Sequence, residues 1–186
     1  MIETERLLLR RSTEADVESP PARLSDPEVM DWLGGVEPPG EVVRLWLDQW
    51  EEFPSGKLLI RLRSDGAVIG RTGANYYDPQ TWRRSALGEP ELGWALAREQ
   101  WGHGYATEAA LAVREWLQAP RFVSLITANN LRSQKVAHRL GARPEQTVEL
   151  PGYGPHVVWV HPLSVGSTEL TQERRRRPVR RRSGET

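Results

Sequence analysis

The sequence contains no cysteine, and this absence excludes disulfide bonds, thiolate metal ligands and a cysteine nucleophile. Long apolar runs are also missing, because no stretch approaches the roughly 20 apolar residues that a membrane helix needs. The first residues, Met1 to Glu5, lack the basic and then apolar order of a signal peptide. From these absences we expect a soluble, cytoplasmic protein that holds no metal and does not enter a membrane.

The whole sequence has no net charge, but its acidic and basic residues are unevenly distributed along the chain. The 186 residues carry 25 basic and 25 acidic side chains, yet seven arginines and only two glutamates occupy residues 173–186. Residues 1–172 are therefore net acidic, which argues against nucleic-acid binding by the body of the protein. A hydrophobic content of 38% is enough for one core. We expect one folded domain over residues 1–163 and a disordered, arginine-rich tail over residues 164–186.

Hydrophobic periodicity indicates a chain of mixed α and β structure. Residues 73–90 show no clear period and are expected to form a loop with exposed aromatic side chains. The order of the elements predicts an α/β (α+β) fold with a mixed sheet, helices on both faces and a parallel β-α-β unit in the middle. The expected strands are 6–10, 58–62, 67–71, 91–96, 121–128, 147–150 and 157–161, and the expected helices are 26–32, 41–52, 104–118 and 130–140.

The most informative segment joins the expected strand 91–96 to the expected helix 104–118. Gly102 and Gly104 lie at the start of that helix and leave its approach clear of side chains. The first N–H groups of a helix have no internal partner and carry partial positive charge, so a phosphate fits there. A phosphate or pyrophosphate site is one hypothesis, and a tight strand-to-helix turn is the other.

Two familiar phosphate-binding motifs do not fit this segment. The dinucleotide fingerprint Gly-x-Gly-x-x-Gly requires glycine where Thr107 stands. A Walker loop requires Gly-Lys followed by serine or threonine, and neither Lys57 nor Lys135 has that context. Nicotinamide dinucleotides and nucleoside triphosphates are therefore disfavoured as ligands.

Three segments resemble one known family. Trp101 to Ala106 is similar to the acetyl-coenzyme A signature of the GNAT superfamily of N-acetyltransferases, with tryptophan in place of the usual arginine or glutamine. Asn130 to Ser133, followed by Leu140 to Ala142, resembles the second motif of the branch typified by ribosomal-protein-alanine acetyltransferases (the Rim-type branch). Thr4 to Arg10 resembles the start of that branch, so the resemblance extends over roughly residues 2–162.

This resemblance implies a GNAT fold, with a mostly antiparallel sheet of about six to seven strands. It also implies acetyl-CoA as cosubstrate and transfer of the acetyl group to a primary amine. The pyrophosphate would contact backbone N–H groups before and in the first turn of the helix, and the pantetheine arm would pair with a strand edge. Asn130 would hydrogen-bond the pantetheine, and Ser133 would lie near the thioester sulfur. The implied coenzyme-binding residues are Trp94, Ala95, Leu96, Gly102, His103, Gly104, Tyr105, Ala106, Thr107, Asn130 and Ser133.

Some of these residues have a second interpretation. Asn130 is a good helix N-cap with Ser133 three residues further on, so both can be structural, and we favour a dual role. His103 is expected to point to solvent, with contact to a coenzyme phosphate as the alternative. Many relatives carry a tyrosine acid seven residues after the asparagine, and Ala137 stands there in this chain.

Acetyl transfer needs a neutral amine, a donor for the developing oxyanion and a proton source for the leaving thiolate. Because cysteine is absent, we expect direct attack in a ternary complex. Glu91 is either the catalytic base or a solvated carboxylate at a strand end. Ser133 is the candidate donor to the thiolate, and Tyr153 is a looser candidate. Since α-amines are less basic than lysine, a weakly equipped site favours a protein N-terminus or a small-molecule amine as acceptor.

The acceptor is expected to contact the turn 149–156 and aromatic residues that flank the cleft, namely Trp32, Tyr76, Tyr77 and Trp82. The alternative is that several of these residues simply belong to the core. Two other classes of function stay open. One is a coenzyme-binding sensor or scaffold that does no chemistry, and the other is a protein tethered to RNA or the ribosome through its basic tail. Because relatives often pair, a homodimer is a further expectation.

Overall fold

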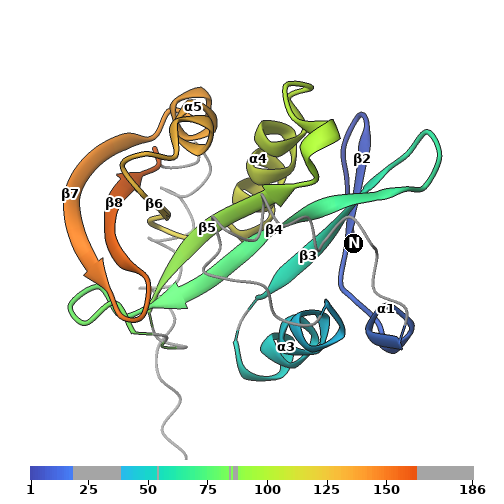
Figure 1. The fold of residues 1–186 in the computed structure, drawn as a ribbon, viewed down its shortest axis with the longest axis horizontal. Coiled ribbons are helices and arrows are strands. Elements are labelled where there is room, and N and C mark those ends of the chain that lie inside the picture. The colour runs from blue at the N-terminus through green and yellow to red at the C-terminus, as the bar shows by residue number, and fades with distance from the viewer. Residues whose placement is uncertain (19–38, 54, 84, 86–87, 163–186) are drawn as a thin grey trace, which may run out of the picture.

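The computed structural model describes residues 1–18, 39–53, 55–83, 85 and 88–162 (Figure 1). The expected helix 26–32, with Trp32, and the expected tail 164–186 lie outside these residues. In chain order the elements are β1 Ile2–Glu3, β2 Leu7–Arg10, α1 Glu14–Glu18, α3 Pro39–Glu52, β3 Lys57–Leu62, β4 Val68–Tyr77, β5 Glu89–Leu96, a 3₁₀ turn Arg98–Gln100, α4 Tyr105–Leu117, β6 Val123–Ile126, α5 Leu131–Arg139, β7 Arg143–Leu150 and β8 Gly154–Val160.

The described strands form one eight-stranded sheet in the order β1-β2-β3-β4-β5-β6-β8-β7. β5 and β6 are parallel and are joined by α4, whereas the other neighbouring pairs are antiparallel. The predicted mixed, mostly antiparallel sheet and its parallel β-α-β unit are thus confirmed. The strand that the sequence did not predict is β1, which is two residues long and pairs with β2.

Helices cover both faces of the sheet, with α4 and α5 on one face and α1 and α3 on the other (Figure 1). On the first face, Ala110 and Val113 of α4 pack in the same core cluster as Leu92 of β5. On the second face, Val43 of α3 packs with Leu59 of β3. All of these residues are at most 1% exposed. Because side chains alternate along a strand, the even-numbered residues of β5 face α4 and the odd-numbered ones face the side of α3.

The stretch 73–90 differs from the exposed loop that the sequence predicted. β4 continues through its first residues, and the aromatic side chains turn inward. Tyr76 is 7% exposed and its hydroxyl lies 3.1 Å from Ser55 Oγ. Trp82 is 8% exposed and packs with Val123 in a second core cluster. The expected exposure of Tyr76 and Trp82 is therefore wrong, because both side chains help to close the interior.

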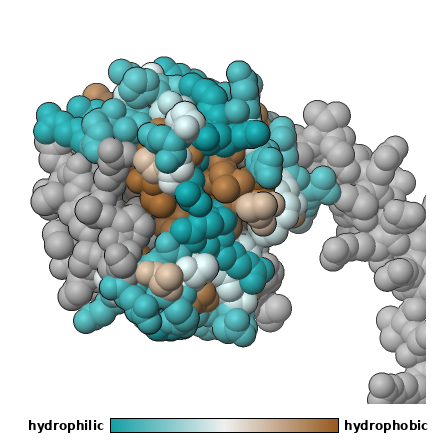
Figure 2. Space-filling view, turned by 90° about the vertical axis from the view of Figure 1, so that its right-hand side faces the viewer, coloured by the Kyte–Doolittle hydropathy of each residue, from teal (hydrophilic) through white to brown (hydrophobic). Residues whose placement is uncertain are grey.

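The surface of the described residues exposes few large apolar side chains. Figure 2, which views the side that lies on the right in Figure 1, shows a mainly hydrophilic face with a central group of hydrophobic residues. Within the described ranges, no helix combines the length and apolar character needed to span a bilayer. The large hydrophobic side chains that are exposed in these ranges come from separate parts of the chain: Met1, Leu45, Trp116, Leu131 and Tyr153.

Candidate active site

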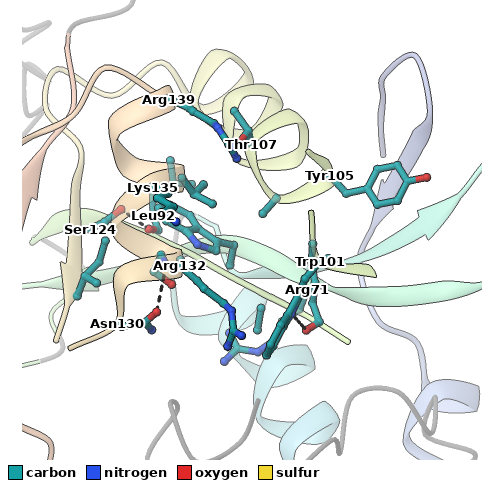
Figure 3. A pocket seen from close by; sticks show the side chains of 18 of the residues that line it. Arg71, Leu92, Trp101, Tyr105, Thr107, Ser124, Asn130, Arg132, Lys135 and Arg139 are labelled. Carbon is teal, nitrogen blue, oxygen red and sulfur yellow. Dashed lines mark hydrogen bonds between the residues drawn. The ribbon is translucent and has the colours of Figure 1, made fainter. Parts of the chain in front are cut away.

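β5 and β6 separate toward their carboxyl ends and leave a cleft between them. The two strands share the register pair Glu91–Val123, and no later residue of β5 pairs with β6 in the described sheet. The cleft has a volume of about 470 Å³ and is lined by the ends of both strands, by the start of α4 and by one side of α5 (Figure 3). The loop that the sequence singled out therefore opens onto a cleft.

A row of unpaired backbone donors faces this cleft at the start of α4. Among the described residues, no N–H group from Gly102 to Thr107 donates a hydrogen bond, and the helical ladder begins with the N–H of Glu108. Gly102 and Gly104 have φ angles of +84° and +83°, and no heavy atom lies within 4 Å of a Cβ built at Gly102. The hydroxyl of Thr107, which also lines the cleft, is buried without a partner. An anion placed here would receive these donors and the partial positive charge of the helix start, so a phosphate site at this loop stays a prediction.

Three basic side chains of α5 line the same cleft: Arg132, Lys135 and Arg139 (Figure 3). Glu91 is the single acidic residue in the described lining. The guanidinium carbon of Arg132 lies 4.3 Å from the ring centroid of Trp101, whose Nε1 donates to Leu96 O at 2.8 Å. This contact joins the loop to α5 across the cleft, and the excess of positive charge suits a polyanionic ligand.

Hydrogen bonds and an ion pair from the N-terminal segment hold the loop before α4 in place. Arg6 donates through Nε to a carboxylate oxygen of Glu108 at 2.7 Å and through Nη1 to the carbonyl of His103 at 2.9 Å. Thr4 Oγ1 donates to the other oxygen of Glu108 at 2.6 Å. Burial raises the pKa of Glu108, but the hydrogen bonds from Thr4 and Arg6 outweigh it and leave the pKa below its ordinary value. The opening segment of the sequence thus fixes the start of α4.

Asn130 and Ser133 form the helix cap that one interpretation predicted. Asn130 Oδ1 accepts the backbone N–H of Ser133 at 3.1 Å at the start of α5 (Figure 3). Both residues also line the cleft. Neither the amide nitrogen of Asn130 nor the hydroxyl of Ser133 has a hydrogen-bond partner in the part of the chain that the structure describes. The cap is confirmed, and contact with a coenzyme stays a prediction.

The edge of β5 that faces the cleft is partly occupied by side chains. Backbone groups alternate in direction along a strand, so the carbonyls of Leu92, Trp94 and Leu96 point to the same edge. Ser124 Oγ donates to Leu92 O at 2.6 Å, and the Trp101 indole donates to Leu96 O. Trp94 lies between the two occupied carbonyls. Ala95 lies between Trp94 and Leu96 in sequence, and its carbonyl points to the opposite edge, where it lies close to Gly70 of β4.

Glu91 is a buried carboxylate with polar neighbours. It is 8% exposed, and its Oε2 lies 3.4 Å from Asn75 Nδ2 and 3.9 Å from Lys57 Nζ. A Cβ at Gly93 would lie 3.0 Å from Lys57 Nζ, so the glycine leaves room for this pair. The alternative of a solvated carboxylate at a strand end is therefore wrong. Glu91 faces the side of α3, and its role as a base stays a prediction.

Several predicted site residues lie away from the cleft. The cleft lining does not include His103, Tyr153 or the aromatic residues Tyr76, Tyr77 and Trp82. His103 is exposed, as expected, and stacks on the ring of Tyr105 with 5.6 Å between centroids. Tyr153 is 57% exposed in the turn between β7 and β8.

Two polar residues of the cleft were missed from the sequence: Lys57 on β3 and Ser124 on β6. His156 on β8 also lines the cleft and falls in the turn 149–156 that the sequence predicted to contact the acceptor. His156 is 9% exposed, and its Nδ1 lies 2.9 Å from Gly154 O. Lys57 and Ser124 belong to no motif. The one signal that could have found them is their position beside or within short apolar runs, where a polar side chain needs a partner.

Comparison with known proteins decides the family. Residues 6–143 match the family model described as acetyltransferase (GNAT) domain. The chain belongs to the GNAT acetyltransferase family. Both the predicted family and the predicted GNAT fold are confirmed, whereas the ribosomal-protein-alanine branch stays a prediction.

Similar proteins agree with this assignment to the GNAT family. The crystal structure of the acetyltransferase from Agrobacterium tumefaciens strain C58 is 31% identical, with a TM-score of 0.70 and coverage of 87% of this chain and 93% of that one. An uncharacterized N-acetyltransferase, p20, from Bacillus licheniformis is 26% identical over 151 residues, which are 76% of this chain and 82% of that protein. The aminoglycoside acetyltransferase AAC(6′)-Ib, solved in complex with coenzyme A, has a TM-score of 0.69 at 22% identity, covers 89% of this chain and 99% of its own, and supports the fold alone.

Proposed function

We propose that this GNAT protein is an N-acetyltransferase that transfers the acetyl group of acetyl-CoA to a primary amine. The observation that carries the proposal is the row of unpaired N–H groups from Gly102 to Thr107 at an open cleft. A phosphate placed there receives several backbone donors and the positive end of the α4 dipole. This arrangement needs no lysine or arginine in the loop itself.

The cleft residues fit the rest of the coenzyme. The amide-rich pantetheine arm would pair with the β5 edge at Trp94, between the occupied carbonyls of Leu92 and Leu96. Asn130 would donate its amide N–H to the same arm. The basic residues of α5 would attract the coenzyme phosphates.

The chemistry follows from the polar groups near the thioester end of this arm. A neutral amine attacks the thioester carbonyl, so the N–C bond forms and the C–S bond breaks. Glu91 would take the proton from the attacking nitrogen, with Lys57 and Asn75 holding its carboxylate. Ser133 would donate a hydrogen bond to the departing thiolate, which needs little acid help because the pKa of a thiol is only about 8.5. The buried Ala137 supplies no phenol acid.

The proposed acceptor is a protein N-terminal α-amine, as in the ribosomal-protein-alanine acetyltransferase branch, or a small-molecule amine. An α-amine, with a pKa of about 7.7 to 8.0 against about 10.4 for lysine, has a much larger neutral fraction at physiological pH, so it needs weaker base catalysis than a lysine side chain. Because Glu91 faces the side of α3, the acceptor would approach from that side of the sheet. Acetyl-CoA is a cytosolic metabolite, so the cytoplasmic location expected from the sequence belongs to the same proposal.

The test combines calorimetry with a product assay. Wild-type protein is titrated with CoA and acetyl-CoA and then supplied with peptides bearing free α-amines and with small primary amines, while thiol release is followed. Binding together with amine-dependent thiol release supports the proposal. Absence of binding overturns it, and binding without any thiol release across the panel supports the coenzyme-sensing alternative instead.

A further inference from the structure

The vertex of the cleft, where β5 and β6 stop pairing, is closed by a buried serine and a buried histidine. Ser124 Oγ lies 2.6 Å from Leu92 O and 2.9 Å from His161 Nε2. Ser124 is 1% exposed and His161 is 3% exposed. Figure 3 shows Ser124 and Leu92 together at one end of the cleft.

The direction of the protons follows from the groups involved. A carbonyl only accepts, so Ser124 gives its single hydroxyl hydrogen to Leu92 O. The hydroxyl then accepts from His161, which must carry its proton on Nε2. His161 is itself held by its backbone N–H, which donates to Phe122 O at 3.0 Å. The result is a series of hydrogen bonds from His161, the residue after β8, through Ser124 of β6 to Leu92 of β5.

These hydrogen bonds lie at the point where the backbone pairing between β5 and β6 would otherwise continue. Beyond the pair Glu91–Val123, no further residue of β5 is in register with β6 in the described sheet, and the carbonyl of Leu92 accepts from the Ser124 side chain. A direct ladder bond at this carbonyl would bring the two strands to their normal separation and narrow the cleft. The Ser124 hydroxyl satisfies the carbonyl through a side chain instead, so the strands stay apart without leaving this carbonyl unpaired, while Nδ1 of His161 is buried without a partner among the described residues.

We propose that Ser124 and His161 are positioning residues that set the opening between β5 and β6 for the pantetheine arm of coenzyme A. The next backbone groups on that edge belong to Trp94, the site at which the arm would pair. This inference rests on the proposed function, because it assumes that coenzyme A is the ligand of the cleft. It assigns a role to two residues that take no part in the proposed chemistry.

Two probes separate positioning from general stability. CoA carries the pantetheine arm, whereas adenosine 3′-phosphate 5′-diphosphate is the nucleotide part of CoA without it. Replacement of the serine by Ser124→Ala removes the hydroxyl and should weaken CoA binding about tenfold, the size of effect expected from one hydrogen bond. Affinity for the nucleotide should change less than about twofold, because the Gly102–Thr107 donors remain. Calorimetry with full-length protein measures both values.

Matched variants control this comparison. Ser55→Ala removes another buried serine, which is 1% exposed and does not line the cleft, and should leave both affinities unchanged. His161→Leu should reproduce the effect of Ser124→Ala, and it carries the test if Ser124→Ala does not fold. His161→Gln keeps an N–H donor at the end of the side chain and should restore most of the CoA affinity.

The outcomes decide between the possibilities. A selective loss of CoA affinity in folded Ser124→Ala or His161→Leu supports the inference. Unchanged CoA affinity in folded Ser124→Ala, or an equal loss for both probes, overturns the inference and leaves the proposed function standing. Failure of the wild-type protein to bind CoA overturns the proposed function, and the inference with it.

Discussion

The two walls of the cleft are built from different kinds of groups. The wall formed by the loop into α4 presents backbone N–H groups from Gly102 to Thr107, held in place by Arg6 and Glu108. The opposite wall, formed by β6 and α5, presents side chains such as Ser124 and Asn130. Backbone donors bind any anion of suitable shape, whereas placed side chains define the path of a longer ligand. The comparison predicts that the two walls fail in different ways when they are altered.

The largest effect is expected when the backbone wall is blocked. Gly104→Glu places a carboxylate where the phosphate would bind and should weaken CoA affinity by about 100-fold or more, or about 2.7 kcal/mol. Gly152→Glu introduces the same side chain at another glycine of positive φ, +85°, with open space around it. Calorimetry should show normal CoA binding by Gly152→Glu. Equal affinities for the two variants would contradict the phosphate site.

The second effect concerns Glu91, a side chain on the strand that leads to the backbone wall. Glu91→Gln keeps the shape of the residue but removes the proposed base, so kcat should fall about 100-fold while the Kd for acetyl-CoA stays unchanged. The control is Glu89→Gln. Glu89 lies on the same strand, pairs with Arg121 and does not line the cleft. A kcat within about twofold of the wild-type value would remove Glu91 from the mechanism.

The third effect is a pH dependence of the free energy of unfolding, which arises from the buried His161 next to Ser124 of the side-chain wall. Burial, and then the nearby Arg114 charge, lower the pKa of His161 from 6.5 to about 4. Between these values the unfolded chain takes up a proton that the folded chain does not, so the free energy of unfolding falls as the pH decreases from 6.5 to 4. The loss is up to about 3 kcal/mol.

Urea unfolding above pH 6.5 and near pH 4 measures this loss. In His161→Gln the same acidification should cost less by that amount, since glutamine does not titrate. Identical pH dependence in the variant and the wild type would show that His161 titrates normally in the folded state.

The smallest effect is expected from the support behind the loop. Glu108→Gln removes the charge that holds Thr4 and Arg6 and should lower the free energy of unfolding by about 2 kcal/mol. CoA affinity should fall a few-fold, because Arg6 also holds the His103 carbonyl. Glu14→Gln breaks an exposed pair with Arg44 far from the cleft and should leave CoA affinity unchanged. If Glu108→Gln binds CoA with the wild-type affinity, the contacts of Glu108 with Thr4 and Arg6 do not support the loop that binds CoA.

Local signals predicted the loop of the backbone wall and the helix cap at Asn130 on the opposite wall. The glycines at 102 and 104 and the cap at Asn130 act within a few residues of themselves, so the chemistry of the chain points to them directly. The parallel pairing of β5 and β6 was also predictable, because two strands joined by a helix in one sheet favour a parallel crossover.

The side-chain wall and the polar cluster beside Glu91 depend on contacts between residues that are far apart in the sequence, so the sequence alone did not predict them. Ser124 meets His161 across 37 residues, and Lys57 reaches Glu91 from another strand. Tyr76 and Trp82 were expected to be exposed because their neighbours are polar, but strand alternation turns Tyr76 inward and the core cluster takes Trp82. Such residues become visible only when the sheet brings distant strands together.

Backbone amide NMR during a CoA titration tests the central claim most directly. If the N–H groups from Gly102 to Thr107 hold the pyrophosphate, their resonances should shift strongly with CoA and equally with adenosine 3′-phosphate 5′-diphosphate. The resonance of Trp94 should shift with CoA alone. Saturation with CoA that leaves the Gly102–Thr107 resonances in place would contradict the account.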